Sequence, residues 1–227
     1  MTGLTGLCRL LERGSPRGGA LFLALLLVVV STLFCFAPTA GAQVPEAAEA
    51  HERTMTRVAA QEFGLPAPAA LLGAQVHQES SWHTAAASGV GAEGLAQFMP
   101  ATAKWIADIY PDLGPAAPYS PGWALRALAR YDRHILDRIH PHQGAVPDCD
   151  RWAFTLSGYN GGPGWVARDR ERAADAGADP DRWWGEVSEH TGRGAAAARE
   201  NRHYVHRILR ELEPHYRRFG WRGVAPC

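Results

Sequence analysis

The sequence lacks the short motifs that usually identify a metal, nucleotide or serine-hydrolase site. It has no His-Glu-x-x-His pair, no glycine-rich loop of the phosphate-binding kind and no Gly-x-Ser-x-Gly element. Ten histidines are present, among them His203 and His206, but no third ligand stands at a recognisable spacing. We therefore expect no metal and no cofactor, and the corresponding three classes of enzyme have no support.

An excess of charge of one sign is also missing, since 23 Lys and Arg residues balance 23 Asp and Glu residues. A protein that binds nucleic acid usually carries a basic face. Arginines do gather between Arg168 and Arg172, but Asp169 and Glu171 alternate with them, as is typical of a solvated helix face. No nucleic-acid partner is expected.

The first 42 residues have the pattern of an export segment. Three arginines precede an uncharged apolar run over residues 20–37, and the small residues Ala40 and Ala42 follow where a signal peptidase would cut. We expect cleavage after Ala42 and a location in the periplasm or cell envelope. The apolar run is also long enough for a signal anchor at the lower limit of a membrane span, so an inner-membrane anchor is the alternative.

Beyond residue 42 the chain has no internal repeat and no long low-complexity tract. About 185 residues are enough for one domain with a substantial core. We divide this part into a linker and first helix at 43–66, of which 43–50 is the linker, and a main domain at 67–227. No run of period-two alternation indicates a strand, so the predicted fold class is all-α.

Proline, glycine and apolar spacing predict where the helices lie. The first helix ends at Phe63, and the next begins at Pro68 and carries Leu72, Val76 and Glu79 on one face. A third helix is predicted from Pro100 through Trp105, Ile106 and Ile109, and a fourth from Ser120 and Pro121 to His140. A fifth follows a cap at Asp148 or Asp150, and a short sixth runs from Asp179 through Trp183 and Trp184. The last predicted helix carries Tyr204, Val205, Ile208 and Leu212 and kinks or ends at Pro214.

Only two of the four cysteines, Cys149 and Cys227, lie beyond the export segment. An exported protein can oxidise such a pair. Either a disulfide ties the C-terminal tail to the start of the helix that carries Tyr159, or Cys227 is a free terminal thiol. The sequence leaves both alternatives open.

Three separated blocks carry the functional signal: Glu79-Ser80 followed by GAEGLAQFMPATA at 91–103, SGYNGGPG at 157–164 and ENRHYVHRIL at 200–209. In this order they resemble the catalytic domain of the soluble lytic transglycosylases, a lysozyme-like family that cleaves bacterial peptidoglycan. The resemblance runs from about residue 68 to residue 212. It implies a lysozyme-like all-α catalytic domain at 67–227, with the glycan strands of peptidoglycan as its partner.

Cleavage of a glycosidic bond requires a proton for the leaving oxygen, and an ordinary glutamate is mostly ionised near neutral pH. Glu79 ends an apolar helix stripe, with only His77 and His83 as nearby candidates for a positive charge. Burial is therefore expected to raise its pKa and to keep it protonated. In the family that the chain resembles, one glutamate is both acid and base while the muramic acid 6-hydroxyl attacks its own anomeric carbon, giving a 1,6-anhydro sugar. The resemblance implies this role for Glu79.

The resemblance and the residue types together indicate seven substrate-binding residues. Ser88 matches a serine that reaches the substrate, and Tyr159 matches a tyrosine whose hydroxyl points at the glutamate and the sugar. The Gln97 amide can donate to and accept from sugar N-acetyl groups. The predicted set is Ser80, Ser88, Gln97, Met99, Tyr159, Asn160 and Glu200.

Some of these residues also have a structural interpretation. For Ser80, hydrogen bonding at a helix end or loop is as good an interpretation as a direct role, and for Asn160 a helix-end or loop brace is the favoured one. Tyr204 either lines the groove or packs. Where the family usually has methionine this chain has Ala96, and it has Asn201 where threonine is more usual. These departures concern the shape of the pocket.

Flat aromatic side chains stack on sugar rings, and Trp82 and Trp165 adjoin the motifs. We expect these two to line a cleft and the other six tryptophans to pack in the core. The core set is Trp105, Trp123, Trp152, Trp183, Trp184 and Trp221.

Two other functions stay open at this point. A hydrolytic muramidase would need a second carboxylate, for which Glu93, Asp108 and Asp112 are candidates. A wall-binding subunit of an envelope-spanning machine would keep the fold with little turnover. Because no wall-binding repeat is recognisable, targeting must come from the groove, the membrane or a partner.

Overall fold

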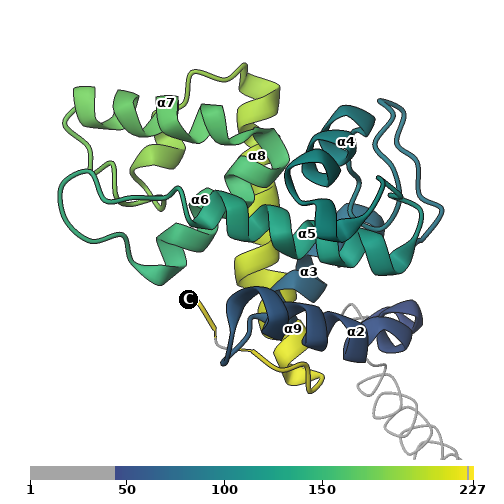
Figure 1. The fold of residues 1–227 in the computed structure, drawn as a ribbon. Coiled ribbons are helices and arrows are strands. Elements are labelled where there is room, and N and C mark those ends of the chain that lie inside the picture. Colours follow the sequence, from purple (N-terminus) through teal and green to yellow (C-terminus); the bar gives the residue numbers. More distant parts are fainter. Residues whose placement is uncertain (1–43, 224) are drawn as a thin grey trace, which may run out of the picture. The chain divides into compact units, whose positions relative to one another are not determined.

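The computed structural model describes residues 44–223 and 225–227. The predicted export segment lies outside the described residues. Within them the chain forms helices joined by loops and turns, with two isolated β-bridges and no strand, which confirms the predicted all-α class (Figure 1). No helix among the described residues is both long and apolar enough to cross a membrane.

The first described helix, α2, spans Glu46–Phe63, so the predicted end at Phe63 is confirmed. The expected linker over 43–50 is wrong from residue 46 onward. Alanine and glutamate favour helix, and Glu46 and Glu49 in the first turn complement the helix dipole. Because Ala48 is fully buried, this turn belongs to the same packed body as the rest.

Helices α2, α3 (Ala69–Ser80), α5 (Pro121–Leu136) and α6 (Asp148–Gly161) form the centre of the fold. Helix α2 packs on α3 and α5, and α5 packs on α6. Helix α3 is buried along nearly its whole length, which fits its short apolar sequence. Helix α3, whose last turn contains Glu79, is therefore enclosed by its neighbouring helices.

Helix α4 (Pro100–Ile109) begins with proline at its first position, as predicted, but of the three large apolar residues expected to pack, Trp105, Ile106 and Ile109, only Ile106 is buried. Trp105 and Ile109 are each 39% exposed, so the expectation that Trp105 lies in the core is wrong. A short 3-10 turn, η1 (Pro111–Leu113), follows. Helix α5 then begins at Pro121 behind Ser120 and ends at Leu136, four residues before the predicted end.

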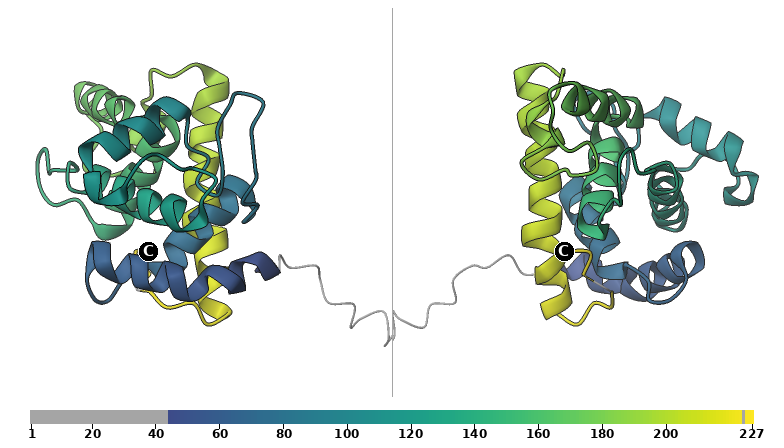
Figure 2. Two further views of the ribbon diagram at one scale, coloured as in Figure 1. Left: turned by 45° about the vertical axis from the view of Figure 1, so that its right-hand side comes forward. Right: turned by 90° about the vertical axis from the view of Figure 1, so that its left-hand side faces the viewer.

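The C-terminal part forms one continuous helical rod, seen along one side of the right-hand view in Figure 2. It consists of α8 (Ala195–His206), the π-helical segment η3 (Arg207–Leu212) and α9 (Glu213–Arg218). Pro214 cannot donate a backbone hydrogen bond, and the π-helical turns immediately before it accommodate this loss. The rod packs along α3 through η3 and α9.

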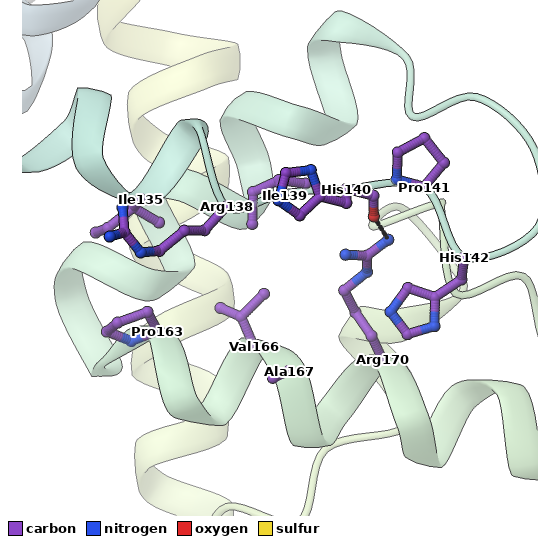
Figure 3. Close-up of a pocket in the computed structure, with 10 residues that line it drawn as sticks. All are labelled: Ile135, Arg138, Ile139, His140, Pro141, His142, Pro163, Val166, Ala167 and Arg170. Carbon is purple, nitrogen blue, oxygen red and sulfur yellow. Dashed lines mark hydrogen bonds between the residues drawn. The ribbon is translucent and has the colours of Figure 1, made fainter.

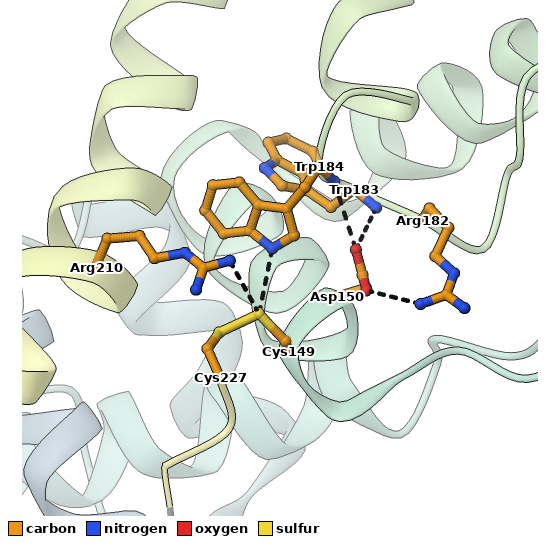
Figure 4. The surroundings of a disulfide bond; sticks show 7 residues. All are labelled: Cys149, Asp150, Arg182, Trp183, Trp184, Arg210 and Cys227. Carbon is orange, nitrogen blue, oxygen red and sulfur yellow. Dashed lines mark hydrogen bonds and ion pairs between the residues drawn. A yellow bond between two sulfur atoms is a disulfide. The ribbon is translucent and has the colours of Figure 1, made fainter.

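The predicted helix at Asp179 is wrong. Helix α7 (Pro163–Asp175) is followed by turns and by a short 3-10 segment, η2 (Val187–Glu189). The Asp150 carboxylate accepts hydrogen bonds from the backbone N–H groups of Trp183 at 2.7 Å and Trp184 at 3.4 Å, as Figure 4 shows. These two N–H groups are therefore not available for hydrogen bonds within a helix. Asp150 also does not cap α6, whose N-cap is Pro147.

A disulfide joins Cys149 to Cys227, so the first of the two alternatives for these cysteines holds. The Trp184 indole N–H lies 3.3 Å from the Cys149 sulfur (Figure 4). The bond fixes the tail to the start of α6, and the tail in turn supports α3. The Arg222 carbonyl accepts from the Ala70 N–H at 2.8 Å, and Trp221 packs so closely on Gly73 that a side chain there would clash.

Candidate functional site

Glu79 lies in the last turn of α3, directly before a strained reversal of the chain. Ser81 and Trp82 both have left-handed backbone angles, with φ of 50° and 66°, which is costly for residues other than glycine. Trp82 is fully buried, and its indole N–H donates to the Tyr216 hydroxyl at 2.7 Å. The expectation that Trp82 lines a cleft is wrong, because its ring instead anchors the turn that follows Glu79.

The Tyr216 hydroxyl also lies 3.2 Å from Nδ1 of His77, which is buried two residues before Glu79. Since the Tyr216 oxygen already accepts from Trp82, its own proton can go to His77. Burial, assisted by the nearby positive charge of Arg207, lowers the pKa of His77. His77 is therefore held neutral and supplies no positive charge to Glu79.

The glycine-rich loop after α3 is joined to Glu79 through Ser80. The Ser80 hydroxyl lies 2.9 Å from the Leu95 carbonyl and 3.3 Å from the Val76 carbonyl, so it ties the helix end to the loop. Within the loop, Gly94 has φ of 70°, and a β-carbon there would come within 1.9 Å of the Pro118 carbonyl oxygen. Only glycine fits that position.

Two predicted binding residues hold the loop to itself. The Ser88 hydroxyl accepts from the Ala92 N–H at 2.8 Å. The Gln97 amide donates to the Gly94 carbonyl at 2.9 Å and the Ala86 carbonyl at 3.3 Å. Both side chains are half-buried, and the Gln97 carbonyl oxygen still has free acceptor capacity.

The Tyr159 hydroxyl lies close enough to Glu79 for the charge of the glutamate to raise its pKa, but it is hydrogen-bonded to a backbone carbonyl and not to Glu79. It donates to the Ala96 carbonyl at 2.7 Å. The ring packs 5.7 Å from Phe98 and 5.4 Å from Tyr131, measured between ring centroids. Tyr159 therefore braces the loop against α6 and α5.

The hydroxyl that bonds to Glu79 belongs to Tyr204 on α8. It donates to Glu79 Oε1 at 2.5 Å, across 125 residues of sequence. Tyr204 is 4% exposed, so of its two predicted roles packing is the better description, with a direct bond to the glutamate that neither role included. The only feature of the sequence that pointed to Tyr204 was its position in the third motif, four residues after Glu200.

The remaining predicted residues lie at the edge of this group. Asn160 is exposed, and its carbonyl oxygen accepts from the Asn201 amide at 2.8 Å. Buried Asn201 also bonds to Ser157, which joins α8 to α6. Glu200 is exposed on α8, and Met99 is 43% exposed at the start of α4. The exposed side chains of Glu200 and Met99 are free to meet a ligand.

The electrostatics of Glu79 fit a proton donor. The residue as a whole is half-buried, but burial of its carboxyl group is the dominant influence and raises the pKa to about 8, while the hydrogen bond from Tyr204 acts in the opposite direction. At neutral pH the carboxyl group is therefore mostly protonated. Tyr204 takes up Oε1, so Oε2 is left to carry the proton.

Three carboxylates were considered as the second catalytic group of a hydrolase, and none of them bonds to Glu79 or to its hydrogen-bond partner. Asp108 pairs with Lys104 at 2.6 Å, and Asp112 pairs with Arg130 at 3.1 Å, both on the surface. Glu93 is half-buried in the loop, where its backbone pairs with Phe98. None of the three is bonded to the Glu79 group.

The tryptophan predictions have mixed outcomes besides Trp82. Trp165 is half-buried on α7 with the Arg168 guanidinium 4.2 Å from its ring centroid, so it is accessible in part. Trp123, Trp183 and Trp221 are buried as predicted, and Trp152 and Trp184 are half-buried against the core.

A separate hollow of about 390 Å³ lies between the end of α5 and α7 (Figure 3). Its walls include Ile139, His140, Val166 and Arg170, and Glu79 is not among the residues that line it. Arg170 is held there by Asp181, at 2.6 Å. Across residues 44–223 and 225–227, no three His, Cys, Asp or Glu side chains are grouped so that they could hold a metal ion.

Known proteins with similar sequences are lytic transglycosylases. Residues 55–181 match the family model "Transglycosylase SLT domain". The chain is 36% identical over 118 residues to the membrane-bound lytic murein transglycosylase F 2 of Alkalilimnicola ehrlichii, covering 51% of this chain and 24% of that protein. It is 37% identical over 113 residues to the membrane-bound lytic murein transglycosylase F of Marinobacter nauticus, covering 50% of this chain and 20% of that protein.

Solved structures support the same fold. An inactive mutant of the lytic transglycosylase Slt from Pseudomonas aeruginosa superposes with a TM-score of 0.57 at 24% identity, over 78% of this chain and 25% of that one. The 70 kDa soluble lytic transglycosylase SLT70 of Escherichia coli gives 0.51 at 24% identity, over 75% and 25%. The chain thus spans about a quarter of the length of each of these relatives. Since the family model covers more than half of its residues, the chain belongs to the transglycosylase SLT domain family.

Proposed function

We propose that the protein is an exported lytic transglycosylase that cleaves the MurNAc-β-1,4-GlcNAc bond of peptidoglycan, with Glu79 as its single acid and base. The observation that carries this proposal is the burial of the Glu79 carboxyl group, which raises its pKa to about 8 within a domain of this family. An acid that keeps its proton at neutral pH is what a poor leaving group such as a sugar hydroxyl needs.

The reaction proceeds in two proton transfers. Glu79 gives its proton to the glycosidic oxygen as the bond from that oxygen to the muramic acid C1 breaks. The 6-hydroxyl of the same muramic acid then bonds to C1, and its proton passes to the Glu79 carboxylate, so that the acid is regenerated and no water is consumed. Tyr204 stabilises the carboxylate between the two transfers, because its hydroxyl donates to Oε1.

The predicted binding residues fit this proposal in two groups. Gln97, Met99 and Glu200 have exposed or half-exposed side chains that can contact the glycan. Ser80, Ser88, Tyr159 and Asn160 act by holding the loop and helix ends in place. Asp108 and Asp112 are each ion-paired with a basic side chain, Lys104 and Arg130 respectively, which supports the anhydro product over hydrolysis by a second free carboxylate. Export depends on residues 1–42, either as a cleaved signal or as an anchor.

Mass spectrometry of muropeptides released from peptidoglycan tests the proposal. The purified protein should release products that are one water lighter than hydrolytic ones, and Glu79→Gln should release none. The exposed Glu171→Gln variant is the matched control and should behave as the wild type. Hydrolytic products would assign a muramidase, and no products from the wild type would favour a wall-binding subunit.

A further inference from the structure

A second buried acid lies behind Glu79 and takes no part in the reaction described above. Asp132, in the middle of α5, is fully buried, and so is Gln75 on α3, one helical turn before Glu79. The Gln75 amide nitrogen donates to Asp132 Oδ1 at 3.3 Å. This contact joins α5 to the catalytic end of α3.

Two oxygen atoms of this pair have no hydrogen-bond partner among the described residues, namely Gln75 Oε1 and Asp132 Oδ2. Both are acceptors when Asp132 is ionised, so neither can satisfy the other. Buried polar atoms in folded proteins are nearly always hydrogen-bonded. What the pair lacks is one donor hydrogen.

A proton on Asp132 Oδ2 supplies this donor. A neutral carboxylic acid has one O–H donor and one carbonyl acceptor, and a carboxamide offers the complementary N–H and C=O. The two planar groups can then form a ring of two hydrogen bonds. Oδ1 accepts from the Gln75 amide while the Oδ2 hydroxyl donates to Gln75 Oε1.

The charged and titratable groups around Asp132 favour the neutral form. Glu79 faces it from α3, Tyr159 from α6 and Tyr204 from α8, and Tyr131 is its neighbour on α5. None of these is a cation, and Asp132 forms no ion pair within the described part of the chain. Burial raises the pKa of Asp132 well above its ordinary value; the hydrogen bond from Gln75 opposes this, and the nearby Glu79 adds a smaller upward effect.

We propose that Asp132 is a neutral carboxylic acid, doubly hydrogen-bonded to the Gln75 carboxamide, and that this pair fixes the turn of α3 that presents Glu79. Asp132 is then a positioning residue and not the second carboxylate of a hydrolase. Its neutrality keeps a second negative charge away from Glu79. The role in cleavage rests on the proposed function, whereas the protonation state does not.

The protonation state is measured directly by NMR of wild-type protein carrying ¹³C-labelled aspartate carboxyl groups. The Asp132 resonance is identified by its loss in Asp132→Asn. We expect it to keep the chemical shift of a protonated acid from about pH 5 to pH 7, where an ordinary aspartate of pKa near 4 is ionised. A titration with its midpoint near pH 4 would overturn the proposal, whatever the activity of the protein.

The positioning role is tested by rescue with the isosteric amide. Asp132→Asn keeps one donor and one acceptor and should cleave within about threefold of wild type, with an unshifted pH–rate profile. Asp132→Leu leaves the Gln75 amide without a partner, so the turn of α3 that carries Glu79 is no longer fixed, and misplacement of the acid should slow cleavage by roughly tenfold or more. Asp137→Asn, an exposed aspartate at the end of the same helix, is the matched control.

Two results would contradict this role. If Asp132→Asn were as impaired as Asp132→Leu, a carboxylate would be required at this position. If the pH–rate profile of Asp132→Asn moved to lower pH, Asp132 would be ionised in the wild type and would raise the pKa of Glu79. Loss of cleavage in Glu79→Gln tests the proposed function separately, so the failure of one proposal is distinguishable from the failure of the other.

Discussion

Replacing Glu79 with glutamine should make the folded protein more stable at pH 8, because the glutamate is held protonated at a cost. Burial raises its folded-state pKa to about 8, from an ordinary value of 4.5. Between these values the unfolded chain releases the proton and the folded protein keeps it. Stability therefore falls as the pH rises from 4.5 toward 8.

The size of this effect follows from the two pKa values. One pKa unit corresponds to about 1.36 kcal/mol, so the penalty grows from roughly 1 kcal/mol at pH 5 to about 4 kcal/mol at pH 8. Glutamine carries no titrating proton, and its carbonyl oxygen can still accept the bond from Tyr204. The variant should therefore gain about 3 kcal/mol relative to wild type between these two pH values.

Urea unfolding at pH 5, 6, 7 and 8 measures this difference, with Glu171→Gln as the control for loss of an exposed carboxylate. The control should follow the wild type at every pH. If Glu79→Gln gained no stability over wild type as the pH rose, Glu79 would be ionised in the folded protein. Burial would then not keep its carboxyl group protonated.

Three further predictions concern other contacts. Tyr204→Phe removes the hydrogen bond that lowers the pKa of Glu79, so the alkaline limb of the pH–rate profile should move to higher pH, and an unchanged limb would argue against this bond. Reduction of the Cys149–Cys227 disulfide should lower the free energy of unfolding by about 2–4 kcal/mol, seen as a lower urea midpoint that Cys149→Ser reproduces without reductant. Asp181→Ala leaves the buried guanidinium of Arg170 without its carboxylate and should lower the free energy of unfolding by about 3–5 kcal/mol in the same assay. A loss below about 1 kcal/mol would show that Arg170 finds another partner.

Much of the fold could be predicted from local patterns. Proline at the start of α4 and α5, and Gly64 after α2, set helix boundaries that depend on backbone chemistry alone. The predictions failed where long-range contacts replaced local ones. The segment near Asp179 did not form a helix because Asp150, from another part of the chain, takes the backbone N–H groups of Trp183 and Trp184.

The candidate site shows the same division. The position of Glu79 at the end of a buried helix stripe could be predicted from apolar spacing, and with it the direction of its pKa shift. Trp82 was wrongly predicted to line a cleft. Its position next to a motif does not determine whether its ring points into the core or toward the surface at the strained turn. Its burial depends on Tyr216, which is 134 residues away in sequence.

The sequence by itself determined the helical class, the motif residues and the position of Glu79 at the end of a buried helix stripe, because these depend on apolar periodicity, on turn chemistry and on short blocks of adjacent residues. Only the tertiary structure decided that Tyr204 is the partner of Glu79, that Tyr159 bonds to Ala96, and that Asp132 is buried against Gln75. Each of these contacts joins helices far apart in the chain. Their geometry depends on how α5, α6 and α8 pack around α3, which no local pattern encodes.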